Sequence, residues 1–446
     1  MISNAADRLA QAAADVLRRN DRGTRTVAAP DLYPHQWSWD AAFVAMGWAR
    51  ISVPRALREL DGLLAGQWAT GMIPHIVFSD EDGYFPGPER WRTERATAAP
   101  SAVRTSGICQ PGVHSLALAV IGSQARANGG EDAELFRDFL GRTFDAWFAW
   151  HRWLGDVRSA NPVGLVEIHH GWESGMDNSP RWDEAYRRVS VGALEPYVRQ
   201  DLRHVSDAGE RPSDRDYDRY VWLLDQLASV AYDDAAARDV VDFRVGDVFF
   251  TALHALSSEL LAGLGDGIAR HDQAAELRAM SRRAGDAVAA TVSPTTGLAR
   301  DADLRAGGWL HAETVGGFAP LVCGAPAPLH DDLVALLMGE RWCGHPDLHR
   351  PLPPTTSPGS PAFVSHNYWR GPQWPVLTWL MSWSLAHHGH HDEAGALREA
   401  GLGQLADLRF AEYYDALDGR PLGSMAQSWT AAVALAWQDR PGGWWA

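Results

Sequence analysis

The stretch that decides the fold is "DVFFTALHALSSELLAGLG", residues 247–265. Its apolar residues recur every three to four positions, which places Phe249, Leu253, Leu256 and Leu260 on one face of a helix. A half-buried strand would instead alternate apolar and polar residues with a period of two. The stretch therefore predicts a long α-helix.

The same periodicity continues in both directions along the chain. Residues 1–20 have the pattern of an amphipathic helix, and further helical patterns cover residues 40–51, 54–69, 113–128, 131–154, 272–292, 330–342, 372–389, 391–410 and 425–438. Alternating strand patterns are nearly absent, and no fixed-period repeat indicates a short-repeat solenoid. We therefore expect an all-α fold, and pairs of antiparallel helices can close into a toroid around a central cleft.

Four long segments interrupt the helical pattern: residues 70–110, 155–182, 183–246 and 344–368. Loops of this length in a compact domain usually carry function, and these are rich in Trp, Tyr and acidic residues. We expect residues 1–182 and 247–446 to form the two parts of one barrel. Residues 183–246, which are rich in Arg and Asp, are expected to form a cap of loops and short helices over the cleft.

Composition and charge exclude several classes of protein. Apolar residues make up 46% and charged residues 22%, which is typical of a globular protein. The net charge of −16 argues against a nucleic-acid partner, because phosphate binding needs a positive field. The absence of a long apolar stretch predicts a cytoplasmic protein without a membrane partner. Homo-oligomerisation stays open.

The three cysteines, Cys109, Cys323 and Cys343, lie far apart, so neither a disulfide framework nor a zinc knuckle is indicated. The histidines at 169–170 and 387–391 could hold a divalent ion, but the second group follows a helical pattern and suits a helix end better. No metal and no cofactor are therefore expected.

The motif "GWESGMDNSPRW", residues 171–182, combines glycines, tryptophans and two carboxylates four positions apart, Glu173 and Asp177. Glycoside hydrolysis uses two carboxyl groups, one as acid and one as base or nucleophile. The acid must keep its proton near neutral pH, which an apolar surround achieves. Asp177 lies between Trp172 and Trp182, so it suits the acid.

A partner for Asp177 must come from another part of the chain. Glu412 in "AEYYDALDG" stands beside two tyrosines, where we expect a helix end before a Gly/Pro loop. The two acids are far apart in sequence, so the chain would have to close on itself to bring them together. Taken singly, an acid in such a position is more often a loop cap or a member of an ion pair than a catalytic group.

Two further clusters of aromatic and polar residues lie at the starts of predicted helices, in "DLYPHQWSWDAAF" (31–43) and "NYWRGPQWPVLTW" (367–379). Aromatic walls are common in sugar-binding clefts. A core rich in tryptophan could account for part of the 21 Trp residues, and Asp40 could simply cap its helix. Core tryptophans should, however, lie in the middle of helices rather than at loop junctions.

The motifs "QWSWDAAF", "GWESGMDNSPRW", "NYWRGPQWPV" and "AEYYDALDG" resemble, in this order, glycoside hydrolase family sixty-three. The resemblance covers essentially the whole chain and implies an (α/α)6 toroid and an inverting glycosidase. At this length we do not expect the extra β-domain of the larger eukaryotic members. In this it is similar to the bacterial branch that acts on glucosylglycerate and mannosylglycerate.

The resemblance implies Asp177 as general acid, Glu412 as general base and Asp40 as a supporting carboxylate. For the walls of the pocket around the cleaved sugar it implies Tyr33, Trp37, Trp39, Trp172, Gly175, Tyr368, Trp369 and Trp374. For the glycerate end it implies Tyr84, Gln110, Arg211, Tyr217 and Gln427. The expected reaction is cleavage of glucosylglycerate to glucose and glycerate, with mannosylglycerate as a further substrate.

Arg211 also suits this role on physical grounds, since a substrate carboxylate needs a charge-assisted and preferably bidentate partner. It could equally be one of several surface arginines nearby. Three other functions stay open: hydrolysis of a neutral α-glucoside, as by a trehalase or glucoamylase; a sugar epimerase that uses a histidine pair such as His169 and His170; and a non-catalytic carbohydrate-binding protein.

Overall fold

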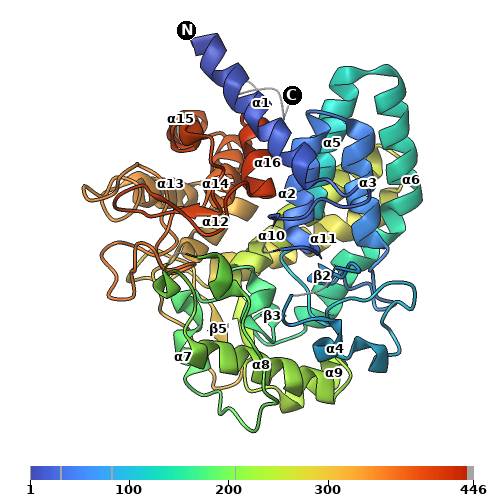
Figure 1. Ribbon diagram of the computed structural model, residues 1–446, viewed down its shortest axis with the longest axis vertical. Helices are drawn as coiled ribbons and strands as arrows, with labels where there is room; N and C mark the ends of the chain where they lie inside the picture. The colour runs from blue at the N-terminus through green and yellow to red at the C-terminus, as the bar shows by residue number, and fades with distance from the viewer. Residues whose placement is uncertain (1, 31–32, 82–83, 206, 439–446) are drawn as a thin grey trace.

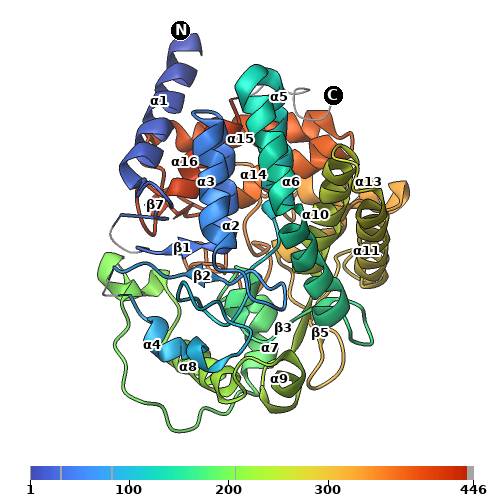
Figure 2. The same cartoon turned by 90° about the vertical axis from the view of Figure 1, so that its right-hand side faces the viewer.

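The computed structural model describes residues 2–30, 33–81, 84–205 and 207–438. Most of the long helices lie together in the upper part of Figures 1 and 2, and their contacts divide them into an inner and an outer ring. The inner ring consists of α2 (Ser38–Ala49), α5 (His114–Asn128), α10 (Val248–Asp266), α12 (Ala319–Cys323), α14 (Pro375–His387) and α16 (Ser428–Ala436). Each inner helix packs against the next one in the chain, and α16 packs back against α2. The ring is therefore closed.

The outer helices alternate with the inner ones along the chain. They are α1 (Ile2–Asn20), α3 (Val53–Leu64), α6 (Gly130–Arg152), α11 (His271–Ala290), α13 (Ala327–Met338) and α15 (His391–Gln404). Each packs against an inner helix next to it in sequence: α11 lies along α10 and α15 along α14. Six such pairs make an (α/α)6 toroid, as the sequence predicted.

The burial of each ring follows from its sequence. Every residue of α2 and of α16 is buried, as expected for helices that are apolar on all sides. The outer helix α3 instead buries one face, which includes Leu57, Leu60 and Leu63, and begins with a Ser52 side chain that accepts a hydrogen bond from the Arg55 amide.

Among the described helices, α10 is the one long and apolar enough to cross a membrane by length and composition. In its most apolar stretch, 78% of the residues are buried inside the protein. This burial is what a central core helix requires.

The toroid closes where its first and last inner helices cross, at Gly47 of α2. A Cβ atom at this position would lie 2.5 Å from the Ala432 Cα of α16, which is closer than two carbon atoms approach. Only glycine allows the two backbones to come this near. The close packing of α2 against α16 that closes the ring therefore requires glycine at position 47.

The long interrupting segments gather at one end of the toroid, below the helical rings in Figure 1. Short antiparallel strands join them there: β1 (Gln36–Trp37) with β2 (Ile76–Val77), β3 (Val166–Ile168) with β4 (Val245–Asp247) and β5 (Ala302–Asp303), and β6 (Tyr413–Tyr414) with β7 (Pro421–Leu422). Trp37 lies opposite Ile76 and Tyr413 opposite Leu422.

Residues 183–246, which we call the cap, contain α7 (Asp183–Tyr186), α8 (Asp214–Ser229) and α9 (Asp234–Val240). Helix α8 packs against α4 (Pro88–Trp91) of the 70–110 segment. It is longer than the short helices that the sequence predicted for the cap. The proposed division into two barrel parts and an inserted cap stays a prediction, and its outermost residues, 1 and 439–446, lie outside the described residues.

The all-α fold and the ten internal helical patterns are confirmed, while the setting predicted for Glu412 was wrong. Glu412 does not end a helix: it directly precedes strand β6, and its amide donates to the Ser424 carbonyl at 2.8 Å. A two-residue strand gives too short a pattern to recognise in sequence, so this hairpin could not be predicted.

Candidate active site

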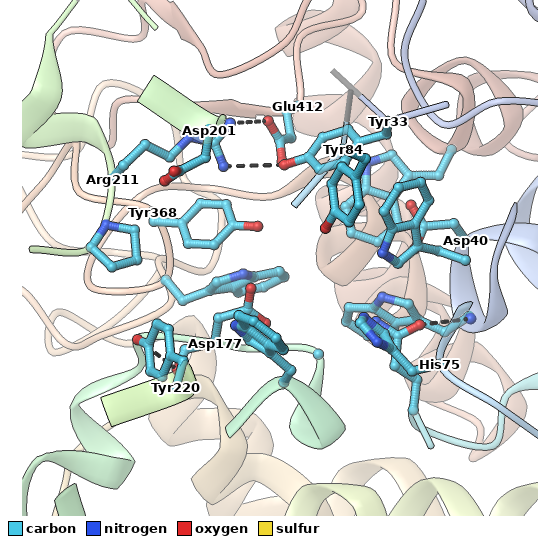
Figure 3. Close-up of a pocket in the computed structure, with 18 of the residues that line it drawn as sticks. Tyr33, Asp40, His75, Tyr84, Asp177, Asp201, Arg211, Tyr220, Tyr368 and Glu412 are labelled. Carbon is cyan, nitrogen blue, oxygen red and sulfur yellow. Dashed lines mark hydrogen bonds and ion pairs between the residues drawn. The ribbon is translucent and has the colours of Figure 1, made fainter. Parts of the chain in front are cut away.

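One pocket at the loop end of the toroid collects nearly all the predicted site residues (Figure 3). Those that line it are Tyr33, Trp37, Trp39, Asp40, Tyr84, Gln110, Trp172, Gly175, Asp177, Arg211, Tyr217, Tyr368, Trp369, Glu412 and Gln427. They come from the starts of inner helices, from the long loops and from the cap, so the closed ring is what brings them together.

The loop that carries Asp177 is shaped by Gly175. A 3-10 helix, η3 (Gly171–Ser174), ends at Gly175 in a left-handed conformation with φ of +70°. A Cβ atom there would lie 2.5 Å from the indole of Trp39, which lines the same pocket. Glycine therefore satisfies both the turn and the close approach of the loop to the aromatic wall.

The neighbouring acid, Glu173, has a structural role. It is fully buried and forms an ion pair with Arg158 at 3.0 Å, and it accepts hydrogen bonds from the backbone amides of Cys109 and His169. Burial alone would raise the pKa of Glu173, but the Arg158 charge and these donors lower it to about 2. Glu173 thus stays ionised and holds the loop in place through contacts in the protein interior.

Asp177 lies in the opposite electrostatic setting. It is partly buried and faces the pocket, and it forms no ion pair with another described residue. Burial raises the pKa of Asp177 to about 7; Arg211 opposes this and the charge of Glu412 adds to it. Trp182, which we expected beside Asp177, lies behind the loop, where its indole N–H donates to the Met176 carbonyl at 2.9 Å. Asp177 can therefore keep a proton near neutral pH.

Glu412 is buried and held by donors on both oxygens. Tyr33 donates its hydroxyl to Oε1 at 3.0 Å, while Arg211 donates from Nη2 to Oε2 at 2.8 Å. The Ser424 amide also donates to Oε2, at 3.0 Å. A carboxylate that pairs with a cation and accepts several hydrogen bonds has the surroundings of an ionised group.

Asp40 is a further carboxyl group of the pocket. It does not cap its helix, since Trp37 occupies the N-cap position and Asp40 lies in the first turn of α2. Burial, together with the charges of Glu412 and Asp177, raises the pKa of Asp40 to about 8. At neutral pH Asp40 is therefore largely protonated and can donate as well as accept a hydrogen bond.

Aromatic rings form the walls between these carboxyl groups. Trp39 and Trp369 lie with their ring centroids 6.1 Å apart, and Tyr33 packs edge-on against Trp37 at 5.2 Å. Trp374 was predicted in the wall, and this was wrong, because it does not line the pocket. It stacks on the far side of Trp369 at 3.7 Å and supports that wall from behind.

Arg211 enters the pocket from the cap, immediately after η6 (Ala208–Glu210). Besides its ion pair with Glu412, its Nη1 donates to the Tyr33 hydroxyl at 3.2 Å, and its guanidinium lies 4.6 Å from the centre of the Tyr368 ring. The sequence predicted Arg211 as a partner of a substrate carboxylate. Its position in the pocket allows that contact, but its partner within the protein is the predicted base.

Two asparagine side chains tie the cap to the Asp177 loop. The Trp369 amide donates to Oδ1 of Asn178 at 2.9 Å, and Nδ2 of Asn178 donates to Oδ1 of Asn367 at 2.6 Å. Nδ2 of Asn367 in turn donates to the carbonyl of Gly209 at 2.6 Å. This asparagine bridge, Asn178 and Asn367, links the acid loop, the aromatic wall and the segment that carries Arg211.

Sequence reasoning missed six residues that also line the pocket: His75, Phe85, Asp201, Pro212, Tyr220 and Trp429. Tyr220 follows Tyr217 by three positions on α8, a spacing that puts both on one helix face and could have identified it. No feature of the local sequence identifies His75 or Asp201 as a pocket residue. Asp201 lines the pocket and forms an ion pair with Arg199 at 2.7 Å. His75 lines it as well and stacks on Trp172.

The pocket does not support a histidine pair. His75 is the one histidine among its described lining residues, while His169 bonds to Glu167 and His170 to the Tyr220 carbonyl. Over the described part of the chain, no group of three or more His, Cys, Asp or Glu side chains is placed to hold a metal ion.

Comparison with known proteins gives matches over nearly the whole chain. Residues 33–430 match the family model of the mannosylglycerate hydrolase MGH1-like glycoside hydrolase domain. Glucosylglycerate hydrolase of Mycolicibacterium hassiacum is 51% identical over 435 residues, which cover 96% of this chain and 97% of that protein.

Two matches come from Thermus thermophilus. Its mannosylglycerate hydrolase is 38% identical over 429 residues, or 95% of this chain and 99% of that protein. A crystal structure of a family-63 mannosylglycerate hydrolase from this species, in complex with Tris and D-glycerate, superimposes with a TM-score of 0.88 at 36% identity, covering 97% of this chain and all of that one.

Proposed function

The chain belongs to the mannosylglycerate hydrolase MGH1-like glycoside hydrolases of family 63, and on this premise we propose that it hydrolyses α-glucosylglycerate to glucose and glycerate with inversion. Asp177 is the proposed general acid and Glu412 the proposed general base. One observation carries the proposal: two carboxyl groups in opposite electrostatic settings, Asp177 able to hold a proton and Glu412 paired with Arg211, line one aromatic pocket.

In the proposed reaction, Asp177 gives its proton to the glycosidic oxygen as the bond from that oxygen to the anomeric carbon breaks. A water molecule attacks the anomeric carbon from the opposite face and gives a proton to Glu412. The sugar therefore leaves with inverted configuration. Asp40, protonated at neutral pH, is placed to hydrogen-bond a sugar hydroxyl from the pocket wall.

An anionic substrate fits this pocket at one place. Arg211 is the only cationic side chain among the described lining residues, which also include the carboxyl groups of Asp40, Asp177, Asp201 and Glu412. A glycerate carboxylate would therefore have to approach Arg211 and share it with Glu412. A guanidinium has five N–H donors, so it can serve two carboxylates at once.

The choice of glucosylglycerate rests on the 51% identical relative of that name. Mannosylglycerate is a second candidate, because the family model and the relative from Thermus thermophilus are named for it. Hydrolysis of a neutral α-glucoside such as trehalose would leave Arg211 without a substrate partner.

The test is release of glucose or mannose from α-glucosylglycerate, α-mannosylglycerate and trehalose, each followed with the purified protein under identical conditions. We expect the highest kcat/KM for α-glucosylglycerate. A preference for trehalose, or no release from either glycerate glycoside, would contradict the proposed substrate.

A further inference from the structure

A histidine in the wall of the pocket, His75, has a ring that no protein group uses. His75 lines the pocket, and only 6% of its surface is exposed. Its ring forms no hydrogen bond with any residue that the structure describes; Nδ1 is fully buried, whereas Nε2 stays accessible from the pocket. Buried polar side-chain atoms nearly always have a hydrogen-bond partner. Nε2 is therefore the nitrogen that a molecule bound in the pocket can satisfy.

The protein holds the His75 ring in place from several sides. The His75 amide donates to the Ile108 carbonyl at 2.6 Å, and the His75 carbonyl accepts from the Ser38 amide at 3.0 Å. The ring stacks on Trp172 with the centroids 6.3 Å apart and lies against Trp91 at 6.1 Å. The ring is thus fixed at the pocket wall and cannot turn away to find another partner.

The ring is also neutral at physiological pH. Burial lowers the pKa of His75 to about 3; the nearby His170 acts in the same direction, while Glu173 opposes it. A neutral imidazole has one N–H donor and one acceptor nitrogen. Such a ring suits a hydroxyl group, which can donate as well as accept, and it offers no charge that would attract the glycerate carboxylate.

His75 lies away from the proposed glycerate contact. In Figure 3, Arg211 and Asp177 lie on one side of the pocket and His75 and Asp40 on the other. With the glycosidic oxygen at Asp177 and the glycerate at Arg211, the sugar ring extends towards His75. The edge of the ring opposite the anomeric carbon carries the hydroxyls at C4 and C6, so these are the groups within reach of His75.

We propose that Nε2 of His75 hydrogen-bonds a hydroxyl at the C4–C6 edge of the sugar and so determines which sugars the enzyme accepts. A substrate without that hydroxyl would leave a polar atom unpaired in a wall of aromatic rings. Glucose and mannose differ only at C2, so the contact would serve both candidate substrates. The inference rests on the proposed function, which places the anomeric carbon near Asp177.

The test compares α-glucosylglycerate with its 2-deoxy, 4-deoxy and 6-deoxy analogues. The wild type and His75→Phe are given each substrate, and kcat/KM is measured from the release of glycerate. Phenylalanine keeps an aromatic ring against Trp172 but has no nitrogen. For the wild type we expect the 4-deoxy or the 6-deoxy analogue to lose about tenfold or more in kcat/KM, because a site built to bind a hydroxyl rejects the analogue without it.

In His75→Phe, the parent substrate should lose a similar factor, and removal of the same hydroxyl from the substrate should then cost less than about threefold more, since the two changes remove one interaction. The penalty for the 2-deoxy analogue should be the same in both proteins, because that hydroxyl lies next to the anomeric carbon. His75→Gln, whose side-chain amide can again offer a hydrogen bond, should restore part of the discrimination.

His35→Phe is the matched control. His35 is a buried histidine that is not among the described residues lining the pocket, and its Nδ1 is hydrogen-bonded to the Ser79 hydroxyl at 2.9 Å. Any loss in this variant should be the same factor for all four substrates.

Three results would overturn the inference and leave the proposed function intact. The first is a wild type that loses less than about threefold on both the 4-deoxy and the 6-deoxy analogue, which needs no variant to fold. The second is equal penalties for these analogues in the wild type and in His75→Phe. The third is a changed penalty for the 2-deoxy analogue alone. No release from α-glucosylglycerate by the wild type would instead overturn the proposed function, and the inference with it.

Discussion

Glu173 and Asp177 lie four residues apart in one motif, but their carboxyl groups lie in opposite electrostatic environments. Glu173 points into the protein, where Arg158 and two backbone amides compensate its charge. Asp177 points into the pocket, and burial raises its pKa to about 7 against the opposing charge of Arg211. The sequence pattern assigned the acid to Asp177, but it could not show the contact of Glu173 with Arg158, whose position depends on the fold.

The first prediction separates the functional carboxyl groups from the structural one. Asp177→Asn and Glu412→Gln should each lower kcat on α-glucosylglycerate by about 10²–10⁴-fold, because each loses one proton-transfer group. Glu173→Gln is the control: it leaves Arg158 buried beside a neutral amide and should mainly lower the melting temperature. Kinetics and thermal unfolding of all three variants provide the measurement. Near wild-type kcat for Asp177→Asn would remove Asp177 from the mechanism.

The second prediction concerns stability and pH at Asp40. Its pKa rises from the ordinary aspartate value of 3.8 to about 8 in the folded protein, so between these pH values the folded state binds more protons than the unfolded state. Stability is therefore lost as the pH rises through this window, by at most about 1.4 kcal/mol per pH unit. Asp40→Asn removes this loss.

Asp40→Asn should raise the free energy of unfolding relative to the wild type at pH 9 and change it little at pH 4, as measured by denaturant titration. Asp138→Asn, at an exposed position of α6, is the control and should show no such dependence. Equal effects of Asp40→Asn at both pH values would mean that Asp40 titrates normally.

At the scale of elements, the helices could be predicted because their apolar period extends over many residues. The strands could not, since pieces of two or three residues, such as β6, contain no measurable period. The misplacement of Glu412 at a helix end follows from this. Helix α8 was underestimated because its sequence is rich in Asp and Arg, although Ser213 and Asp216 form a capping box at its start.

The closure of the toroid gives the third prediction. Gly47→Ala places a Cβ atom 2.5 Å from the backbone of α16 and should cost about 1–3 kcal/mol of stability, as overpacking does. Gly141→Ala on the outer helix α6 meets nothing within 4 Å and should stabilise by about 0.5–1 kcal/mol. Denaturant midpoints measure both. A neutral Gly47→Ala would show that α2 and α16 can separate without cost.

The asparagine bridge gives the fourth prediction. Asn367→Ala disconnects the Asn178 amide from the Gly209 carbonyl, so the segment that carries Arg211 is no longer fixed to the acid loop. Because catalysis depends on the relative positions of these groups, kcat/KM should fall by about tenfold or more. Asn128→Ala, which removes an exposed side-chain hydrogen bond on α5, is the control and should leave kcat/KM unchanged. Equal kcat/KM values in the two variants would show that the bridge has no role in catalysis.

At the scale of the whole molecule, periodicity predicted helices, whereas the (α/α)6 closure followed from the family resemblance of four motifs. Two of those motifs lie at the starts of the inner helices α2 and α14 and two in loops at the same end of the toroid, which is why the ring brings Asp40, Asp177 and Glu412 into one pocket. His75 and Asp201 could not be found in this way. His75 joins the pocket from a distant segment and stacks on Trp172, while Asp201 lies in the cap and pairs with Arg199, its neighbour two residues away.

The central claim is that Asp177 and Glu412 act as acid and base on opposite faces of an α-linked sugar. Proton NMR of the glucose released by the wild-type protein from α-glucosylglycerate, recorded in the first minutes before the anomers equilibrate, tests it most directly. Inversion predicts β-glucose as the first product, with α-glucose appearing only at the rate of mutarotation. α-Glucose as the first product would contradict the account, because it would require a covalent intermediate and a retaining pair of carboxyl groups.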